Sequence, residues 1–365
     1  MPNKFIISGG GTGGHIFPAI SIANALKRRF PDADILFVGA RGRMEMDRVP
    51  AAGYAIEGLP VSGFDRKNLL KNIKVLINLG RSILKARGII RRFKPEVAIG
   101  VGGYASAPVL KAASAFGVPT VLQEQNSYAG VTNKLLAKKA SAICVAYEGM
   151  EKFFPAGKIK KTGNPVRQDL FLVKPGAREA YDLFGFDPAK KTLLIVGGSL
   201  GARTINKSVM QFLQQLCEAN IQVIWQTGKF YIEDARKAAL PYKCKELLVT
   251  DFVSRMDYAY AIADLVISRA GASSISELCL LAKPSILVPS PNVAEDHQTQ
   301  NALALVKHDA AVMIKDVEAQ FNLIPKAIEL IKNENELQKL SENILKLADK
   351  NSDERIVDEI CKLIK

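Results

Sequence analysis

The sequence predicts an α/β protein with two domains in tandem, each built on a doubly wound parallel sheet. The 365 residues exceed what one ordinary hydrophobic core requires. Short apolar runs alternate with helical stretches along the chain, a pattern typical of parallel sheets. Near the start of each half, a strand runs into a glycine-rich turn, at 9–14 and at 197–201. Such turns before helices are typical of Rossmann-like domains, so we expect two of these domains with a cleft between them.

The first half contains six strand candidates and five helix candidates. The apolar runs predict strands at 5–8, 34–38, 54–58, 97–101, 120–123 and 142–145. Helical periodicity predicts helices at 19–29, 44–52, 69–93, 108–116 and 132–138. Pro18 would suit the first turn of the first of these helices. Gly163-Asn164-Pro165 predicts a break and a hinge, so the first domain is placed at 1–164.

The second half repeats this organisation without repeating the sequence. Strands are expected at 192–196, 222–226, 247–251, 265–268, 285–288 and 311–314, with a helix at 205–218 after the second glycine turn. The second domain is placed at 165–341. The chain from about 324 to 365 is predicted to be helical and ends in an amphipathic segment, 355–364, that could dock on either domain.

Composition indicates a soluble protein of a reducing compartment, and we expect it to be cytoplasmic. Apolar residues make up 48% of the chain and charged residues 24%. The five cysteines are scattered and form no C-x-x-C pair, which argues against a disulfide framework or a zinc site. No apolar run reaches the roughly 18 residues of a membrane span, and the start lacks a secretory signal.

The net charge of +14 is concentrated in the first half. Residues 1–164 hold 25 Lys and Arg against 10 Asp and Glu, whereas the remainder holds 25 against 26. This asymmetry predicts an anionic partner, which could be nucleic acid, an anionic membrane or a phosphorylated substrate.

The strongest positive segment is 66–94, with ten basic and no acidic residues. One helical stripe carries Lys67, Lys71, Lys74, Arg81 and Lys85, and another carries apolar residues including Leu76 and Leu79. The segment is either a sheet-covering helix with a solvated basic face or a surface that docks on an anionic membrane. Nucleic acid is disfavoured because Phe93 is the segment's one aromatic residue for base stacking.

The first glycine turn by itself does not identify the ligand that binds there. Its spacing fits the dinucleotide fingerprint, but the second strand ends at Arg41 rather than at an acidic residue. An NADP-dependent oxidoreductase therefore stays possible. His15 is the one ionisable side chain of the turn, and it either bonds the backbone or acts in catalysis. The pair Asp32 and Asp34 is interpreted as a turn rather than a metal site.

The start of a second-half helix, 271–277, combines small residues with free backbone N–H groups. Such a start is suited to a diphosphate, with Glu277 one turn further on for a ribose diol. The alternative is an ordinary capped helix in which Glu277 interacts with the helix dipole. Glycine turns and this helix start all lie at the carboxyl ends of strands, where open α/β sheets bind ligands.

Taken together, these motifs resemble the MurG family of GT-B glycosyltransferases. The resemblance covers nearly the whole chain through Gly10–His15, Gly102–Pro108, Glu124–Asn126, Ala129–Lys134, Gly163–Arg167, Gly197–Arg203, Gly271–Glu277 and Asp296–Ala302. It implies two Rossmann-like domains facing a cleft, with the last helix, about 342–365, returning to the first domain.

The resemblance implies transfer of GlcNAc from UDP-GlcNAc to the MurNAc 4-hydroxyl of lipid I, undecaprenyl-pyrophosphoryl-MurNAc-pentapeptide, with inversion. The product is lipid II for peptidoglycan synthesis. No metal or other cofactor is implied, because a helix N-terminus and an arginine can hold the diphosphate. The enzyme would bind the anionic cytoplasmic face of the plasma membrane peripherally through 66–94, and no nucleic acid.

The resemblance also implies roles for single residues. His15 is the candidate base. Arg167 and Ser199 would contact the diphosphate, the Val253 backbone the uracil, and Gln298 the GlcNAc hydroxyls. Tyr104 and Ser106 are expected on the acceptor side. The helix start that meets phosphate and ribose comprises Ala272, Ser273, Ser274, Ile275, Ser276 and Glu277, and the residues that face the sugar from the first domain are Thr12, Gly13, Gly14 and Asn126.

One position departs from the family pattern, which usually has histidine where this chain has Gln123. His15 is then the one histidine in a first-domain motif, which strengthens its assignment as the base. The alternatives are a GT-B enzyme with another lipid acceptor, an NAD(P)-dependent oxidoreductase, and a non-enzymatic basic binding module.

Overall fold

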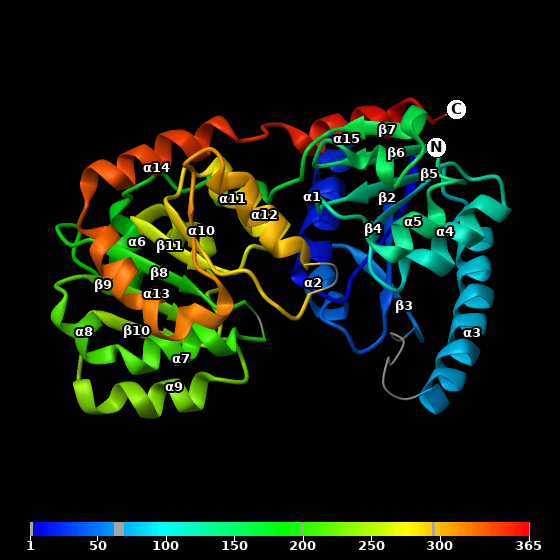
Figure 1. Ribbon diagram of the computed structural model, residues 1–365. Coiled ribbons are helices and arrows are strands. Elements are labelled where there is room, and N and C mark those ends of the chain that lie inside the picture. The colour runs from blue at the N-terminus through cyan, green and yellow to red at the C-terminus, as the bar shows by residue number, and fades with distance from the viewer. Residues whose placement is uncertain (1–2, 62–68, 199, 294–295, 365) are drawn as a thin grey trace. The chain divides into compact units, whose positions relative to one another are not determined.

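The computed structural model describes residues 3–61, 69–198, 200–293 and 296–364. The chain divides into two compact units (Figure 1). The N-terminal unit comprises 1–167 together with 350–365, and the C-terminal unit comprises 168–349. Asn164 is buried, and its amide bonds Gln123 and the Gln125 carbonyl. The segment predicted to be a hinge is thus part of the N-terminal unit, which ends at Arg167 rather than at 164.

The N-terminal unit is built on a parallel sheet of seven strands in the order β3-β2-β1-β4-β5-β6-β7. The six predicted strands are present, and the sheet gains an edge strand, β7, that the sequence did not predict. The short β7 has two exposed residues, so it lacks the apolar run that marks the others. The strands are β1 (Lys4–Gly9), β2 (Asp34–Ala40), β3 (Ala55–Leu59), β4 (Val97–Gly102), β5 (Thr120–Glu124), β6 (Ala142–Val145) and β7 (Ile159–Lys161).

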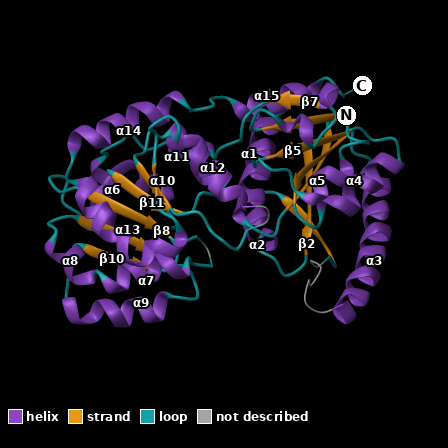
Figure 2. Ribbon diagram, in the orientation of Figure 1, coloured by secondary structure: helices purple, strands orange, loops and turns teal. Residues whose placement is uncertain are grey.

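Helices cover both faces of this sheet (Figure 2). One face packs against α1 (Gly13–Arg29), α2 (Glu45–Ala51) and α15 (Ser352–Cys361). The other face packs against α3 (Leu69–Phe93), α4 (Ser106–Ala115) and α5 (Val131–Leu136). Two 3-10 turns, Met150–Lys152 and Ala156–Lys158, precede β7. Two-sided burial explains why the central strands are apolar throughout.

Helix α1 begins at Gly13, six positions before the predicted start at Ala19. Thr12 is its extended N-cap residue, and the Thr12 carbonyl accepts from the N–H groups of His15 and Ile16 at 3.1 and 3.2 Å. His15 therefore belongs to the first helical turn rather than to the loop. Pro18 lies inside the helix, not in its first turn as predicted.

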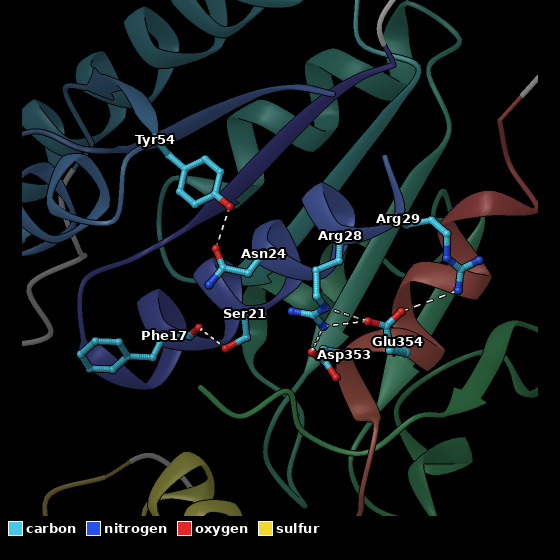
Figure 3. Close-up of polar contacts among 8 residues, drawn as sticks. All are labelled: Phe17, Ser21, Asn24, Arg28, Arg29, Tyr54, Asp353 and Glu354. Carbon is cyan, nitrogen blue, oxygen red and sulfur yellow. Dashed lines mark hydrogen bonds and ion pairs between the residues drawn. The ribbon is translucent and has the colours of Figure 1, made fainter. Parts of the chain in front are cut away.

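The last helix, α15, packs on α1 (Figure 3). Arg28 contacts Asp353 and Glu354 at 2.6 and 2.7 Å, and Arg29 contacts Asp358 at 2.9 Å. Ile356, Val357 and Ile360 join the core beneath. The helix expected at 342–365 is in fact divided, because the chain leaves α14 after Lys346 and Asn351 adopts a left-handed conformation (φ 58°) before α15.

The C-terminal unit has a parallel sheet of six strands in the order β10-β9-β8-β11-β12-β13. All six strands were predicted, with ends that differ by a residue or two. They are β8 (Thr192–Val196), β9 (Gln222–Gln226), β10 (Leu247–Thr250), β11 (Leu265–Ser268), β12 (Ser285–Leu287) and β13 (Val312–Met313).

The helices of the C-terminal unit differ from the prediction in two places. The helix expected at 205–218 is two helices, α7 and α8, and the helical tail begins at Asp316 rather than near 324. The helices are α6 (Arg178–Phe184), α7 (Arg203–Gln211), α8 (Leu213–Glu218), α9 (Ile232–Ala239), α10 (Met256–Ile262), α11 (Ala272–Leu280), α12 (His297–Val306), α13 (Asp316–Ile331) and α14 (Glu334–Lys346), with 3-10 turns at Gln168–Phe171 and Leu240–Tyr242. Residues of α7, α8, α13 and α14 share one core.

We predict that Ile360→Ala destabilises the N-terminal unit by about 2–5 kcal/mol, because it opens a cavity in the core between α15 and the sheet. Hydrogen exchange should rise in α1, β1 and β4. The matched control is Ile344→Ala in α14, since both side chains are 0% exposed but Ile344 belongs to the other unit. Faster exchange of the C-terminal unit in Ile360→Ala would contradict the assignment of α15.

Candidate functional site

Two glycine turns meet at the carboxyl ends of β1 and β4. Gly9 pairs with Gly102, where the register of the two strands shifts. Gly103 has a φ of +87°, and a Cβ placed on it would lie 2.4 Å from the Gly10 carbonyl oxygen. Only glycine allows this backbone approach. The two turns predicted separately from the sequence thus form one structural feature.

The carboxylate of Glu45 occupies the inner side of the first turn. Its Oε2 accepts a 2.9 Å hydrogen bond from the Gly11 N–H, and its Oε1 accepts one of 2.9 Å from the Ala40 N–H. Glu45 is 0% exposed, and a Cβ on Gly10 would collide with it. The Gly11 N–H group, which could otherwise bind an anionic ligand, therefore donates to the carboxylate of Glu45. Glu45 was not predicted as a site residue from the sequence. The one signal for it is its position as an acidic residue in the first turn of α2.

His15 lies beside both turns. Its Nδ1 is 3.4 Å from the Thr12 hydroxyl, and its ring packs so closely on Gly102 that a Cβ there would lie 2.8 Å from Nε2. The side chain is half-buried, whereas Thr12 and Gly14 are exposed and Gly13 is half-buried. These four residues, predicted to act together, do lie together at the start of α1.

The two predicted acceptor-side residues have different environments. Tyr104 is 55% exposed just after the second turn. Ser106 is 0% exposed, and its hydroxyl lies 2.7 Å from the Ser8 carbonyl and 2.8 Å from the Gly102 carbonyl. The Ser106 hydroxyl thus holds the ends of β1 and β4 together, and its acceptor-side role stays a prediction.

Glu124, at the end of β5, orders the loop that carries Asn126. Its Oε1 accepts from the backbone and side-chain amides of Asn126 at 3.1 and 3.3 Å. Its Oε2 accepts from the Gly130 N–H and the Asn133 side chain, both at 2.9 Å. Asn126 is half-buried. Through these four hydrogen bonds, Glu124 ties Asn126, Gly130 and Asn133 to the end of β5.

Gln123, where the family usually has histidine, is fully buried. Its Nε2 donates to Asn164 at 3.1 Å, and its Oε1 accepts from Gln125. Arg167, which follows this buried segment, lies with its guanidinium 4.7 Å from the centre of the Phe17 ring of α1. Arg41 donates to the Gly58 carbonyl at 3.1 Å, which gives it a structural contact in place of a 2′-phosphate.

The glycine loop of the C-terminal unit is packed as tightly as that of the N-terminal unit. A Cβ on Gly228 would lie 2.1 Å from the Gly201 nitrogen, and Gly201 has a φ of +91°. Ser199, predicted to contact a diphosphate, lies outside the described residues. The loop leads directly into α7, which begins at Arg203.

A cavity of about 570 Å³ opens beside this loop. Its cationic lining residues are Arg203, Lys207 and Arg269, and the predicted sugar-contacting residue Gln298 lines it as well. Gln298 Oε1 accepts from the Ser290 N–H at 2.8 Å. The cavity is therefore polar and positively charged, as a site for a phosphorylated sugar requires.

The predicted diphosphate helix, α11, begins after the extended residue Gly271, which is its N-cap residue and has no side chain to bond the first turn. Ala272 and Ile275 are buried, and Ser273, Ser274 and Ser276 are half-buried. Glu277 is 9% exposed, and the Tyr260 hydroxyl donates to its Oε2 at 3.2 Å. Val253 is buried in the loop after β10. Positions 272–277 thus follow the pattern of a phosphate-binding helix start.

The basic segment forms helix α3 as predicted. Ala86, Ile89 and Ile90 pack on the sheet, while Ile77 and Leu84 are 54% and 67% exposed and Arg81 is exposed. Leu79 is half-buried, and Lys85 donates to the Gly58 carbonyl at 2.9 Å, so its ammonium is engaged within the protein. Lys67 lies outside the described residues, and the side chains of Lys71, Lys74 and Leu76 are not described.

Within 3–61, 69–198, 200–293 and 296–364, no helix is long and apolar enough to cross a membrane. The same residues contain no group of three His, Cys, Asp or Glu side chains that could hold a metal ion.

Comparison with known proteins supplies the family. Residues 5–145 match the glycosyltransferase family 28 N-terminal domain, and residues 192–359 match the glycosyltransferase family 28 C-terminal domain. A protein of Parabacteroides distasonis is 64% identical over 99% of this chain and 98% of its own length. One of Cytophaga hutchinsonii is 57% identical over 100% of this chain and 97% of its own length. Both are named UDP-N-acetylglucosamine--N-acetylmuramyl-(pentapeptide) pyrophosphoryl-undecaprenol N-acetylglucosamine transferase.

Among solved structures, MurG of Acinetobacter baumannii superposes with a TM-score of 0.74. It is 25% identical to this chain, and the match covers 99% of this chain and 100% of that one. The predicted fold class, GT-B with two parallel α/β domains, is confirmed.

We predict that Glu45→Gln lowers the free energy of unfolding of the N-terminal unit by about 1–3 kcal/mol. The new side-chain amide has one oxygen and one NH₂ group, so one of the two backbone N–H groups that the carboxylate bonds loses its acceptor. Chemical denaturation measures the change. Asp47→Asn, an exposed carboxylate of the same helix, is the control and should have little effect. Equal stability of the two variants would show that the Glu45 carboxylate is not needed for the turn.

Proposed function

The chain belongs to glycosyltransferase family 28, and we propose that it transfers GlcNAc from UDP-GlcNAc to the MurNAc unit of lipid I. The observation that supports this function is the 64% and 57% sequence identity, over 99% and 100% of the chain, to two relatives whose names state this activity. The product, lipid II, is the disaccharide precursor of peptidoglycan. Family membership leaves the NAD(P)-dependent oxidoreductase and the non-enzymatic binding module without support.

The donor is assigned to the C-terminal unit. The start of α11, which follows the N-cap residue Gly271, would meet the diphosphate and ribose, with Glu277 accepting from the ribose hydroxyls. Val253 would face the uracil through its backbone. Ser199 is proposed to contact the diphosphate as well, and so is Arg167, although it is the last residue of the segment 1–167 of the N-terminal unit. No metal or other cofactor is invoked, since the helix dipole and the guanidinium supply the positive charge. Gln298 would bind GlcNAc hydroxyls at the cavity.

The sugar and the acceptor are assigned to the edge where the two glycine turns of the N-terminal unit meet. Inversion requires in-line attack by the MurNAc 4-hydroxyl, so the enzyme needs a base but no covalent nucleophile. His15 is proposed as this base, supported by its half-buried ring beside the turns. Thr12, Gly13, Gly14 and Asn126 would face the sugar, and Tyr104 the acceptor.

The membrane contact is assigned to α3 on the cytoplasmic face. Its support is the combination of exposed Ile77 and Leu84 with exposed Arg81 on one helix. Apolar side chains enter the headgroup region while cations attract anionic lipid. Lys67, Lys71, Lys74 and Leu76 remain part of this proposal, whereas Lys85 and Leu79 contribute less because both are partly used inside the unit.

The deciding experiment is product analysis with UDP-GlcNAc and a lipid I analogue, with and without a chelator. Formation of the β-linked disaccharide in both samples is the expected result. Diacylglycerol replaces lipid I in a parallel reaction, since transfer to it alone would identify a different lipid acceptor. Loss of turnover on chelation would overturn the metal-independent mechanism.

We predict that His15→Ala reduces turnover by about 10²–10⁴-fold and leaves UDP-GlcNAc binding unchanged, because a base acts only in the chemical step. Transfer of radiolabelled GlcNAc measures turnover, and calorimetry measures binding. His308→Ala removes an exposed histidine of the C-terminal unit and should behave as wild type. Full turnover in the His15 variant would refute the base assignment.

We predict that Arg81→Glu weakens binding to vesicles containing phosphatidylglycerol about 30-fold, because each basic residue at an anionic surface contributes about 1 kcal/mol and charge reversal doubles that loss. Leu84→Ser should weaken binding at high salt as well, when charge attraction is screened. The matched control is Lys237→Glu, a charge reversal on exposed α9 of the other unit. An equal effect of the control would exclude α3 as a specific docking surface.

A further inference from the structure

A largely buried ion pair joins three segments around the cavity of the C-terminal unit. Arg269 follows β11, and Asp316 opens α13; their side chains are 20% and 17% exposed. Nη1 of Arg269 donates to Asp316 Oδ1 and lies 3.1 and 3.2 Å from the carbonyls of Val288 and Pro289. The other carboxylate oxygen of Asp316 accepts from the Thr204 hydroxyl at 2.9 Å.

The segment held by Arg269 also determines how Gln298 is oriented. Pro289 is followed by Ser290, whose N–H donates to Gln298 Oε1 at 2.8 Å. Because the amide oxygen accepts from this N–H, the amide NH₂ is the end left to meet a ligand in the cavity. An amide NH₂ donates to hydroxyl and carbonyl oxygens, the groups that a sugar presents. The pair and Gln298 line the same cavity.

We propose that Arg269 and Asp316 are positioning residues for the sugar end of the donor. This inference rests on the proposed function, in which Gln298 binds GlcNAc. Thr204 lies in the first turn of α7, directly after the glycine loop, so the pair holds that loop and the 288–290 segment at a fixed spacing. Arginine suits this position because its guanidinium is planar and stays charged, so Nη1 faces the carboxylate and both carbonyls in one fixed orientation.

The test compares two ligands by calorimetry, UDP-GlcNAc and UDP, on Asp316→Asn. The expected result is a rise of about tenfold in the Kd of UDP-GlcNAc, with the Kd of UDP changed less than about twofold. Glu318→Gln is the matched control, because it removes an exposed carboxylate from the same helical turn. Arg269→Lys keeps the charge without the planar guanidinium and should weaken UDP-GlcNAc binding as well.

A double-mutant cycle tests whether the pair acts through Gln298. In a Gln298→Ala background, Asp316→Asn should have no further effect on the ratio of the two Kd values. Equal weakening of UDP and UDP-GlcNAc, or a lowered thermal midpoint with both ligands lost, would overturn the inference and assign the pair to the stability of the unit. Unchanged binding of both ligands would overturn it too. Failure of the wild type to bind UDP-GlcNAc would instead refute the proposed function.

Discussion

The close approach of two backbones at the ends of β1 and β4 is the constraint on which the N-terminal unit depends. Gly103 lies against the Gly10 carbonyl, where no other residue fits. Three side chains then complete the contact: Glu45 accepts from Gly11, Ser106 bridges the two strand ends, and His15 packs on Gly102. The proposed base thus lies against the backbone of the second turn and beside the Thr12 hydroxyl of the first.

The strands could be predicted because each central one is buried on both faces, and continuous apolar runs result. The residues at which helices begin are harder to predict from the sequence. Four of the five residues at 10–14 are glycines, which disfavour helix, yet α1 begins at Gly13 because packing against the sheet outweighs propensity. The division between α14 and α15 was also missed, since it depends on a left-handed Asn351 between two helical patterns.

The candidate site could be predicted where its residues are neighbours in the sequence. His15, Thr12 and the glycines adjoin in sequence, so their neighbourhood followed from one turn. The contacts of Ser106 and Arg269 could not be predicted because their partners are distant in sequence. Ser106 bonds a carbonyl 98 positions away, and Arg269 bonds a carboxylate 47 positions away. Such contacts follow from strand order, which pattern alone leaves open.

The return of α15 to α1 has a consequence for how the protein is made. Ile356, Val357 and Ile360 belong to the core of the unit that also contains the first residues of the chain. During synthesis α15 emerges from the ribosome only after all of 168–349 has emerged. The C-terminal unit can therefore complete its fold first, and the usual N-to-C order of domain folding is reversed for this chain. Until α15 emerges, α1 exposes the apolar surface that α15 covers.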